Sequence, residues 1–218
     1  AEFRRLAEAW DGRAGVDSVG YRLVRDFRSS VAELALAPIF AGCTDAMPSF
    51  DWHRFHYEAA LQTLLREKPA HLLDPRYPSW DALQLAAVDA VIAHLDRQGV
   101  PLDRATWGRY NVARIDHPLA RVFPGWLAGW LNMPAVPLPG DVDMPRLQSP
   151  TFGASMRMVV SPGHEEEGLL HLAGGQSGHP LSPFYRAGFE AWVKGEPTPF
   201  RPGPAVHTRP LAWPAAAP

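Results

Sequence analysis

Ser177 and His179 stand two residues apart in the segment GGQSGHP, and serine and histidine are residue types that combine in nucleophilic catalysis. The nucleophile elbow of serine hydrolases has the pattern G-x-S-x-G at a sharp turn from strand to helix. Here His179 occupies the final glycine position, so the pattern fails by one residue. We therefore favour a structural interpretation of this segment, in which its glycines let the end of a strand bend sharply near another backbone. A self-contained serine hydrolase that uses Ser177 is the alternative.

Histidines and acidic residues also raise the question of a metal site. His53 and His56 are spaced i, i+3, whereas a zincin helix requires two histidines at i, i+4 with a glutamate between them. The surface of an amphipathic helix fits this pair better. Three consecutive acids at 165–167 point in diverging directions in a polar turn, and no alternating Asp/Asn pattern accompanies Glu165, Glu166 and Glu167. We expect a solvated turn there, and no cofactor or metal on this chain.

Cys43 and Arg157 are the two other residues that could be reactive or functional. Cys43 is the only cysteine, which excludes an intrachain disulfide and a cysteine-based zinc site. No activating pattern surrounds this thiol, so we expect a small buried side chain. Arg157 lies in a strand-like segment among apolar or small residues, and on a buried side it needs a carboxylate or carbonyl partner. We expect a structural anchor, with support of a neighbouring active site as the alternative role.

Composition excludes two kinds of partner. The chain has 218 residues, of which 46% are hydrophobic, and this content is ample for a buried core. Its 21 Lys and Arg residues balance 23 Asp and Glu residues, and no basic run is dense enough to follow a phosphate backbone. No window approaches the roughly 18 apolar residues of a membrane span. We therefore expect neither nucleic acid nor membrane as a partner.

The first half of the chain has the pattern of helices separated by proline-containing loops. A helix is expected near 3–10, and Asp17 or Ser18 is placed to cap the next one, which ends near Pro38. A third helical stretch covers about 51–67, with Trp52, Phe55 and Ala59 in one stripe, widened by Tyr57, Leu61 and Leu64. Ser79 caps a fourth helix that stops at Gly99 and Pro101. Its core face is expected to carry Leu85, Val88, Ile92 and Leu95.

The second half loosens and then changes period. Four prolines at 134–145 rule out a long regular element, so 106–152 is expected to wrap the core as a covering segment. Alternation at 154–160 predicts a strand, LLHLAGG a second strand, and SPGHEEEG the turn of an antiparallel hairpin. Ser182 and Pro183 are placed to begin a helix that carries Tyr185, Phe189 and Trp192 and ends at Gly195. The proline-rich tail at 200–218 is expected to be extended.

These elements give an α+β chain with two regions. Residues 1–150 form a mainly helical region with a long proline-rich loop, and residues 151–218 hold the hairpin, the terminal helix and the tail.

Several motifs, taken together and in order, resemble the penicillin acylase family of N-terminal-nucleophile amidohydrolases. The most specific are GASMRMVV at 153–160 and GGQSGHPLSPFY at 174–185. The others are WDGR at 10–13, DS at 17–18, PSW at 78–80, WGRYN at 107–111, HPLA at 117–120 and PLPGD at 137–141. This resemblance spans essentially the whole chain and corresponds to the last quarter of a family precursor, at the C-terminal end of its large subunit. It implies a four-layer αββα fold, of which this chain supplies part.

The resemblance also implies a reaction that this chain does not complete by itself. Family members are periplasmic precursors that cleave themselves and hydrolyse amides through an acyl-enzyme on an N-terminal Ser. Residue 1 is Ala, and the chain looks cut from a longer polypeptide, so the Ser is expected in another segment. The implied partners are the small subunit, the N-terminal part of the large subunit and a small N-acyl substrate, either an acyl-homoserine lactone or a β-lactam antibiotic. A structural calcium held by other segments is compatible with the family, and quorum quenching is an implied role.

The chain departs from the family's usual pattern at several positions, including GDVDMPR at 140–146, which replaces the Thr and Asn often seen there. Asn111 stands where members often carry His, His179 where Asn is common, and Ser161 where an acid often follows the strand. These differences bear on the substrate more than on the fold. No catalytic residue is placed on this chain, and Arg157 is the one supporting candidate. A noncatalytic structural or interaction module is a further alternative.

Overall fold

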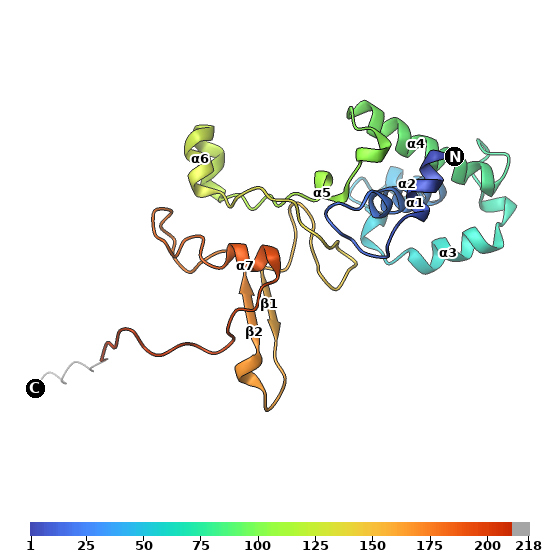
Figure 1. The fold of residues 1–218 in the computed structure, drawn as a ribbon. Helices are drawn as coiled ribbons and strands as arrows, with labels where there is room; N and C mark the ends of the chain where they lie inside the picture. The colour runs from blue at the N-terminus through green and yellow to red at the C-terminus, as the bar shows by residue number, and fades with distance from the viewer. Residues whose placement is uncertain (211–218) are drawn as a thin grey trace, which may run out of the picture. The chain divides into compact units, whose positions relative to one another are not determined.

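The computed structural model describes residues 1–210 and divides the chain into two compact units (Figure 1). The first unit combines Ala1–Arg114 with Ala135–Gly153, and the second combines Ile115–Pro134 with the residues from Ala154 onward. The first is helical, and the second holds a two-stranded antiparallel sheet and short helices, so the chain is α+β as expected. Among the described residues, no helix has the length and apolar character needed to cross a membrane.

Helix α1 (Glu2–Glu8) and helix α2 (Val19–Ala46) begin the helical unit. The Ser18 hydroxyl accepts the backbone N–H of Tyr21 at 3.1 Å, which confirms this residue as the cap of α2. The expected end near Pro38 is wrong, because α2 continues to Ala46. Proline in a helix interior costs about 3 kcal/mol. Packing beyond it compensates, since the Phe40 ring lies 6.0 Å from Trp52 and 5.8 Å from Phe50, centroid to centroid.

The third helical stretch is interrupted, contrary to the continuous helix expected over 51–67. A short 3₁₀ helix, η1 (Trp52–Arg54), precedes helix α3 (Glu58–Glu67). Asp51 accepts the backbone N–H of His53 at 3.2 Å, and such local side-chain acceptors compete with helix formation. Phe55 is consequently 57% exposed, while Leu61 is buried. Of the predicted stripe, Trp52 is buried in the core, while Phe55 and Ala59 are exposed. The core face of α3 is instead the one that carries Leu61, with Tyr57 and Leu64 partly buried beside it.

Helix α4 (Trp80–Arg97) has the predicted ends but a different core face. Ser79 accepts the backbone N–H of Ala82 at 3.1 Å, and Gly99 has φ +66° directly after the helix, so both termini are confirmed. Of the expected face, Leu85 is 67% exposed. The buried face instead carries Trp80, Leu83, Ala87, Val91 and Leu95. Leu95 of the expected face is buried as predicted, but the rest of the buried face is shifted around the helix. Helix α4 packs on α2, and Ala87 belongs to the same buried cluster as Ala32 and Ala35.

Three short helices and an irregular segment complete the helical unit. The helices are η2 (Ala70–Leu72), η3 (Leu102–Arg104) and α5 (Trp107–Tyr110). Residues 135–153 contain no helix or strand and pack on the unit with Leu138 fully buried, as a covering segment does. The indole N–H of Trp107 donates to the Gly140 carbonyl at 2.8 Å, and the Asn111 amide donates to the Leu138 carbonyl at 2.8 Å. These side-chain hydrogen bonds add to the isolated β-bridges, Val112 with Pro137 and Gln148 with Gly153, that hold the backbone of this segment.

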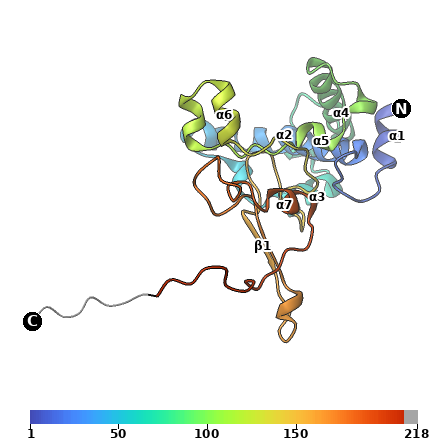
Figure 2. The ribbon, with the colours of Figure 1, turned by 60° about the vertical axis from the view of Figure 1, so that its left-hand side comes forward.

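The second unit contains the expected hairpin. Strand β1 (Met156–Val159) pairs antiparallel with strand β2 (Leu169–Leu172), and Arg157 lies opposite His171. The turn contains a 3₁₀ helix, η5 (Glu165–Glu167), at the tip of the hairpin (Figure 2). Two helices from the middle of the chain, η4 (Pro118–Val122) and α6 (Gly125–Leu131), also belong to this unit and were not predicted.

Helix α7 (Phe189–Lys194) begins later than Ser182, where the sequence predicts its cap. Ser182 instead accepts the N–H of Phe184 at 3.2 Å in a turn. The chain before α7 is held by Arg186, which donates to three carbonyls at the end of α6, those of Gly129, Trp130 and Asn132. Gly195 ends α7 at φ +73°, as predicted. Tail residues 201–210 have no helix or strand and are exposed, and 211–218 lie outside the described residues.

Gly175 should tolerate no side chain, because a Cβ there would overlap the carbonyl oxygen of Phe184. Gly178 is the matched control, with nothing within 4 Å of its Cβ position. We expect Gly175→Ala to lower the free energy of unfolding by about 1–3 kcal/mol, the usual cost of overpacking. Gly178→Ala should leave it nearly unchanged. Urea unfolding of the chain measures both, and equal stability of the two variants would contradict the close approach.

Candidate functional site

Arg157 connects strand β1 to helix α7. Its Nη1 donates to the backbone carbonyl of Trp192 at 2.7 Å, and the guanidinium carbon lies 4.8 Å from the centroid of the Trp192 ring. The expected carbonyl partner is therefore present. The Trp192 indole N–H in turn donates to the Ala154 carbonyl at 2.9 Å. These contacts fix the helix on the hairpin and support a structural role for Arg157.

Ser177 and His179 serve as acceptors within their own turn. The Ser177 hydroxyl accepts the backbone N–H of His179 at 3.1 Å, and Nδ1 of His179 accepts the N–H of Leu181 at 3.2 Å. Over residues 1–210, no hydrogen bond joins the imidazole of His179 to the hydroxyl of Ser177. The favoured interpretation, in which the glycines allow a close approach to another backbone, is supported because Gly175 passes directly beside the backbone of Phe184.

The histidine pair at 53 and 56 lies outside α3. Nδ1 of His53 contacts Asp51 at 2.9 Å and Nε2 contacts Glu33 at 3.0 Å, so both ring nitrogens face carboxylates. Partial burial lowers the pKa of His53, but the hydrogen bonds to the two carboxylates outweigh it and the pKa is raised. His53 is therefore held in an exposed ion-pair network.

The acidic turn is only partly as expected. Glu165 bonds the N–H of Gly163 at 3.0 Å, while His164, Glu166 and Glu167 bring one ligand atom each within 4.8 Å of one another at the surface. Exposed acidic groups of this kind are common without an ion, so the cluster by itself does not define a site.

The prediction of a buried Cys43 is wrong, because this thiol is exposed. The cause is the continuation of α2 past Pro38. Residues 41–49 all lie at the surface, since these last turns extend beyond the part of α2 that packs in the core.

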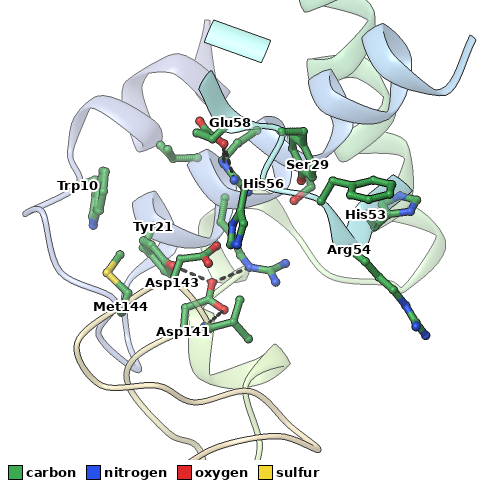
Figure 3. A pocket seen from close by; sticks show the side chains of 16 residues that line it. Trp10, Tyr21, Ser29, His53, Arg54, His56, Glu58, Asp141, Asp143 and Met144 are labelled. Atoms are coloured by element: carbon green, nitrogen blue, oxygen red, sulfur yellow. Dashed lines mark hydrogen bonds and ion pairs between the residues drawn. The ribbon is translucent and has the colours of Figure 1, made fainter. Parts of the chain in front are cut away.

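The helical unit also contains a pocket of charged and aromatic side chains that the sequence did not predict (Figure 3). The pocket has a volume of about 750 Å³ and is lined by residues near α1, from α2, from the η1 to α3 connection and from residues 141–144. At its base, Asp141 accepts the Tyr21 hydroxyl and Nε of Arg25, each at 2.7 Å. The other oxygen of Asp141 accepts the N–H of Val142 at 2.7 Å. One carboxylate thus satisfies three donors.

Charge pairing dominates the electrostatics of this pocket. Burial and the hydrogen bond to Asp141 both raise the pKa of Tyr21. Burial would lower the pKa of Arg25, but the charge of Asp141 outweighs it and the pKa is raised. Arg28 shows the same balance with Glu58, with which it forms an ion pair. Each of these arginines is consequently locked in its charged form.

These features suit binding better than covalent chemistry. A phenol with a raised pKa is a poor nucleophile or acid at neutral pH, and no described residue of the pocket forms a hydrogen-bonded serine and histidine pair. Aromatic walls from Trp10 and Tyr57, with paired charges between them, can hold a polar segment or ligand. The sequence gives little warning of this site, because Asp141 meets Tyr21 across 120 positions.

The bond between Tyr21 and Asp141 predicts an alkaline loss of stability. A raised folded-state pKa means that the contribution of Tyr21 is present below its ordinary pKa of about 10 and is lost as pH rises above it. Tyr21→Phe should cost about 1 kcal/mol at neutral pH and remove this alkaline component. Asp141→Asn should cost more, roughly 3 kcal/mol, because it removes the closer of the two carboxylates that Arg25 contacts and leaves only Asp26, at 3.7 Å. Urea unfolding from pH 7 to 11 tests both, and parallel pH profiles for Tyr21→Phe and the unmutated chain would contradict the assignment.

Comparison with known proteins confirms the family resemblance. Residues 1–206 match the family model of penicillin amidase. The chain is similar to the penicillin acylase 2 proenzyme of Pseudomonas sp. (strain SE83), at 30% identity over 201 residues that cover 84% of this chain and 24% of that proenzyme. The chain therefore spans about a quarter of the length of the curated relative that it matches. Since the family match extends over nearly the whole sequence, this chain belongs to the penicillin amidase family.

Proposed function

We propose that this chain is the C-terminal segment of the large subunit of an N-terminal-nucleophile amidohydrolase. The enzyme cleaves the side-chain amide of N-acyl compounds through an acyl-enzyme on a Ser of another segment. The observation that carries the proposal is the penicillin amidase match over residues 1–206, together with a relative that is a proenzyme about four times as long. Penicillin acylases are hydrolases, and a proenzyme is processed, so companion segments of the same precursor are the proposed partners.

The proposed chemistry needs groups that this chain does not supply. The Ser hydroxyl attacks the amide carbonyl, and the α-amine of the same residue, with an ordinary pKa near 8, takes up the proton. Fixed N–H donors then stabilise the oxyanion. The role of the present chain is to complete the scaffold around these groups.

The hairpin supports a scaffold role. Met156 and Met158 share one face of β1 and are each 55% exposed, whereas Arg157 on the opposite face packs against Trp192 of α7. Two-stranded sheets are marginally stable in water. The bare methionine face and the outer edge of β1, which pairs with no other described strand, suit burial by further strands and a second layer. We propose that other segments provide these in a four-layer αββα fold.

The finer features of the proposal follow from the family. The substrates are acyl-homoserine lactones or β-lactam antibiotics, which would give the enzyme a role in quorum quenching or in antibiotic conversion. The site of action is the periplasm, and any structural calcium is held by other segments.

The decisive experiment is coexpression of this chain with the remaining segments of its precursor. Intact-mass measurement of the purified assembly should show a companion chain that begins with Ser. The assembly should hydrolyse an N-acyl-homoserine lactone or benzylpenicillin, whereas the present chain alone should be inactive. Turnover by the chain alone would place the nucleophile here. An intact assembly without turnover on either substrate would refute the substrate class.

A pair of serine variants separates the proposal from a serine hydrolase that uses Ser177. Ser177→Ala in the assembly should retain activity within about twofold, because the hydroxyl only accepts a local N–H. Ser182→Ala is the matched control, since Ser182 makes the same kind of turn with Phe184. Loss of a catalytic serine lowers kcat by more than about 10³-fold. A loss of that size in Ser177→Ala alone would establish Ser177 as the nucleophile.

A further inference from the structure

A second cavity of the helical unit differs in charge from the pocket around Asp141. It has a volume of about 610 Å³, and three arginines line it, namely Arg22 from α2, Arg109 from α5 and Arg114. No Asp or Glu is among its described lining residues. Two threonines and a serine also line it. The cavity therefore offers hydrogen-bond donors and positive charge without an acid of its own.

The positive charge of this cavity is only partly compensated. Arg22 is buried, forms an ion pair with Asp26, and lies over the Tyr110 ring with 4.3 Å between the guanidinium carbon and the centroid. Arg109 and Arg114 are exposed, and neither forms an ion pair within residues 1–210. The cavity thus retains about two positive charges. In the first pocket, by contrast, Arg25 and Arg28 each face a carboxylate.

The walls also fix the chemistry of a suitable ligand. Guanidinium groups match phosphate and carboxylate oxygens in geometry and can donate two parallel hydrogen bonds. The rest of the wall includes the apolar side chains of Leu95, Val100 and Pro150 and the ring of Tyr110. A phosphate ion alone would leave much of a cavity of this size unfilled.

We propose that this cavity binds a small organic dianion, whose phosphate or carboxylate oxygens contact Arg109 and Arg114 and whose apolar part lies against Tyr110. Arg22, held by Asp26, forms the fixed side of the site. The inference rests on the helical unit alone and does not require the proposed amidase activity.

Phenyl phosphate, with inorganic phosphate for comparison, is the probe for the experiment. Calorimetric titration at constant ionic strength, with chloride as the balancing anion, should show binding to the chain and to the coexpressed assembly, and phenyl phosphate should bind more tightly. Arg109→Gln/Arg114→Gln should weaken binding by about tenfold or more for each charge removed. The affinity of Arg109→Lys/Arg114→Lys should lie between those of the unmutated chain and the double-Gln variant, since lysine keeps the charge but lacks the planar pair of donors.

The matched control is Arg97→Gln/Arg104→Gln, which also removes two positive charges, but from exposed positions outside the cavity. This variant should keep the affinity of the unmutated chain. Circular dichroism verifies that every variant is folded. Equal weakening in both double-Gln variants would indicate a general charge effect and overturn the proposal, as would absence of binding to the unmutated chain. Binding to the isolated chain that disappears in the assembly would also overturn it, because another segment would then fill the cavity.

Discussion

The helical unit depends on the hydrogen bonds that the carboxylate of Asp141 accepts from helix α2. Segment 135–153 contains no helix or strand, and isolated β-bridges hold its backbone, so side-chain hydrogen bonds add to its attachment. Asp141 accepts from Tyr21 and Arg25 of α2, and the adjacent Gly140 carbonyl accepts from Trp107. Gly140 has φ +93°, and a side chain there would overlap the carbonyl of Arg146. Gly140 and Asp141 thus join the irregular segment to helix α2 and to the buried Trp107. The pocket around Asp141 forms where these parts meet.

Helix α2 carries its arginines into two different electrostatic settings. Arg25 and Arg28 face carboxylates in one pocket, and Arg22 lies in the wall of the other beside two arginines that form no ion pair with any described residue. Residues three apart on a helix differ in direction by about 60°, so neighbouring arginines of one helix can serve separate cavities. The contrast arises from what faces the helix, since Asp141 and Glu58 come from other segments.

Local signals were the part of this fold that the sequence could predict. Ser18, Ser79, Gly99 and Gly195 mark helix ends through their own backbone and side-chain chemistry, and each was confirmed. The hairpin was predictable because side chains of a strand alternate between its two faces, and this period of two residues is visible in the sequence. The core face of α4 was not, since close contact with α2 buries Ala87 and leaves Leu85 exposed. The site around Asp141 was hidden for a related reason, because its members belong together only through tertiary packing.

The helical unit is discontinuous in sequence. The chain leaves it after Arg114, contributes Ile115–Pro134 to the other unit, and returns for Ala135–Gly153. Because the partners of Tyr21 lie 120 positions away, the unit cannot close until this late segment has been synthesised, and contacts of such high sequence separation slow folding. During synthesis, α2 and α4 can pack together early, while the hydrogen-bond donors of Tyr21 and Arg25 still lack their acceptor, Asp141. The order of translation therefore makes the nascent helical unit most vulnerable to proteases or misassociation until Asp141 arrives.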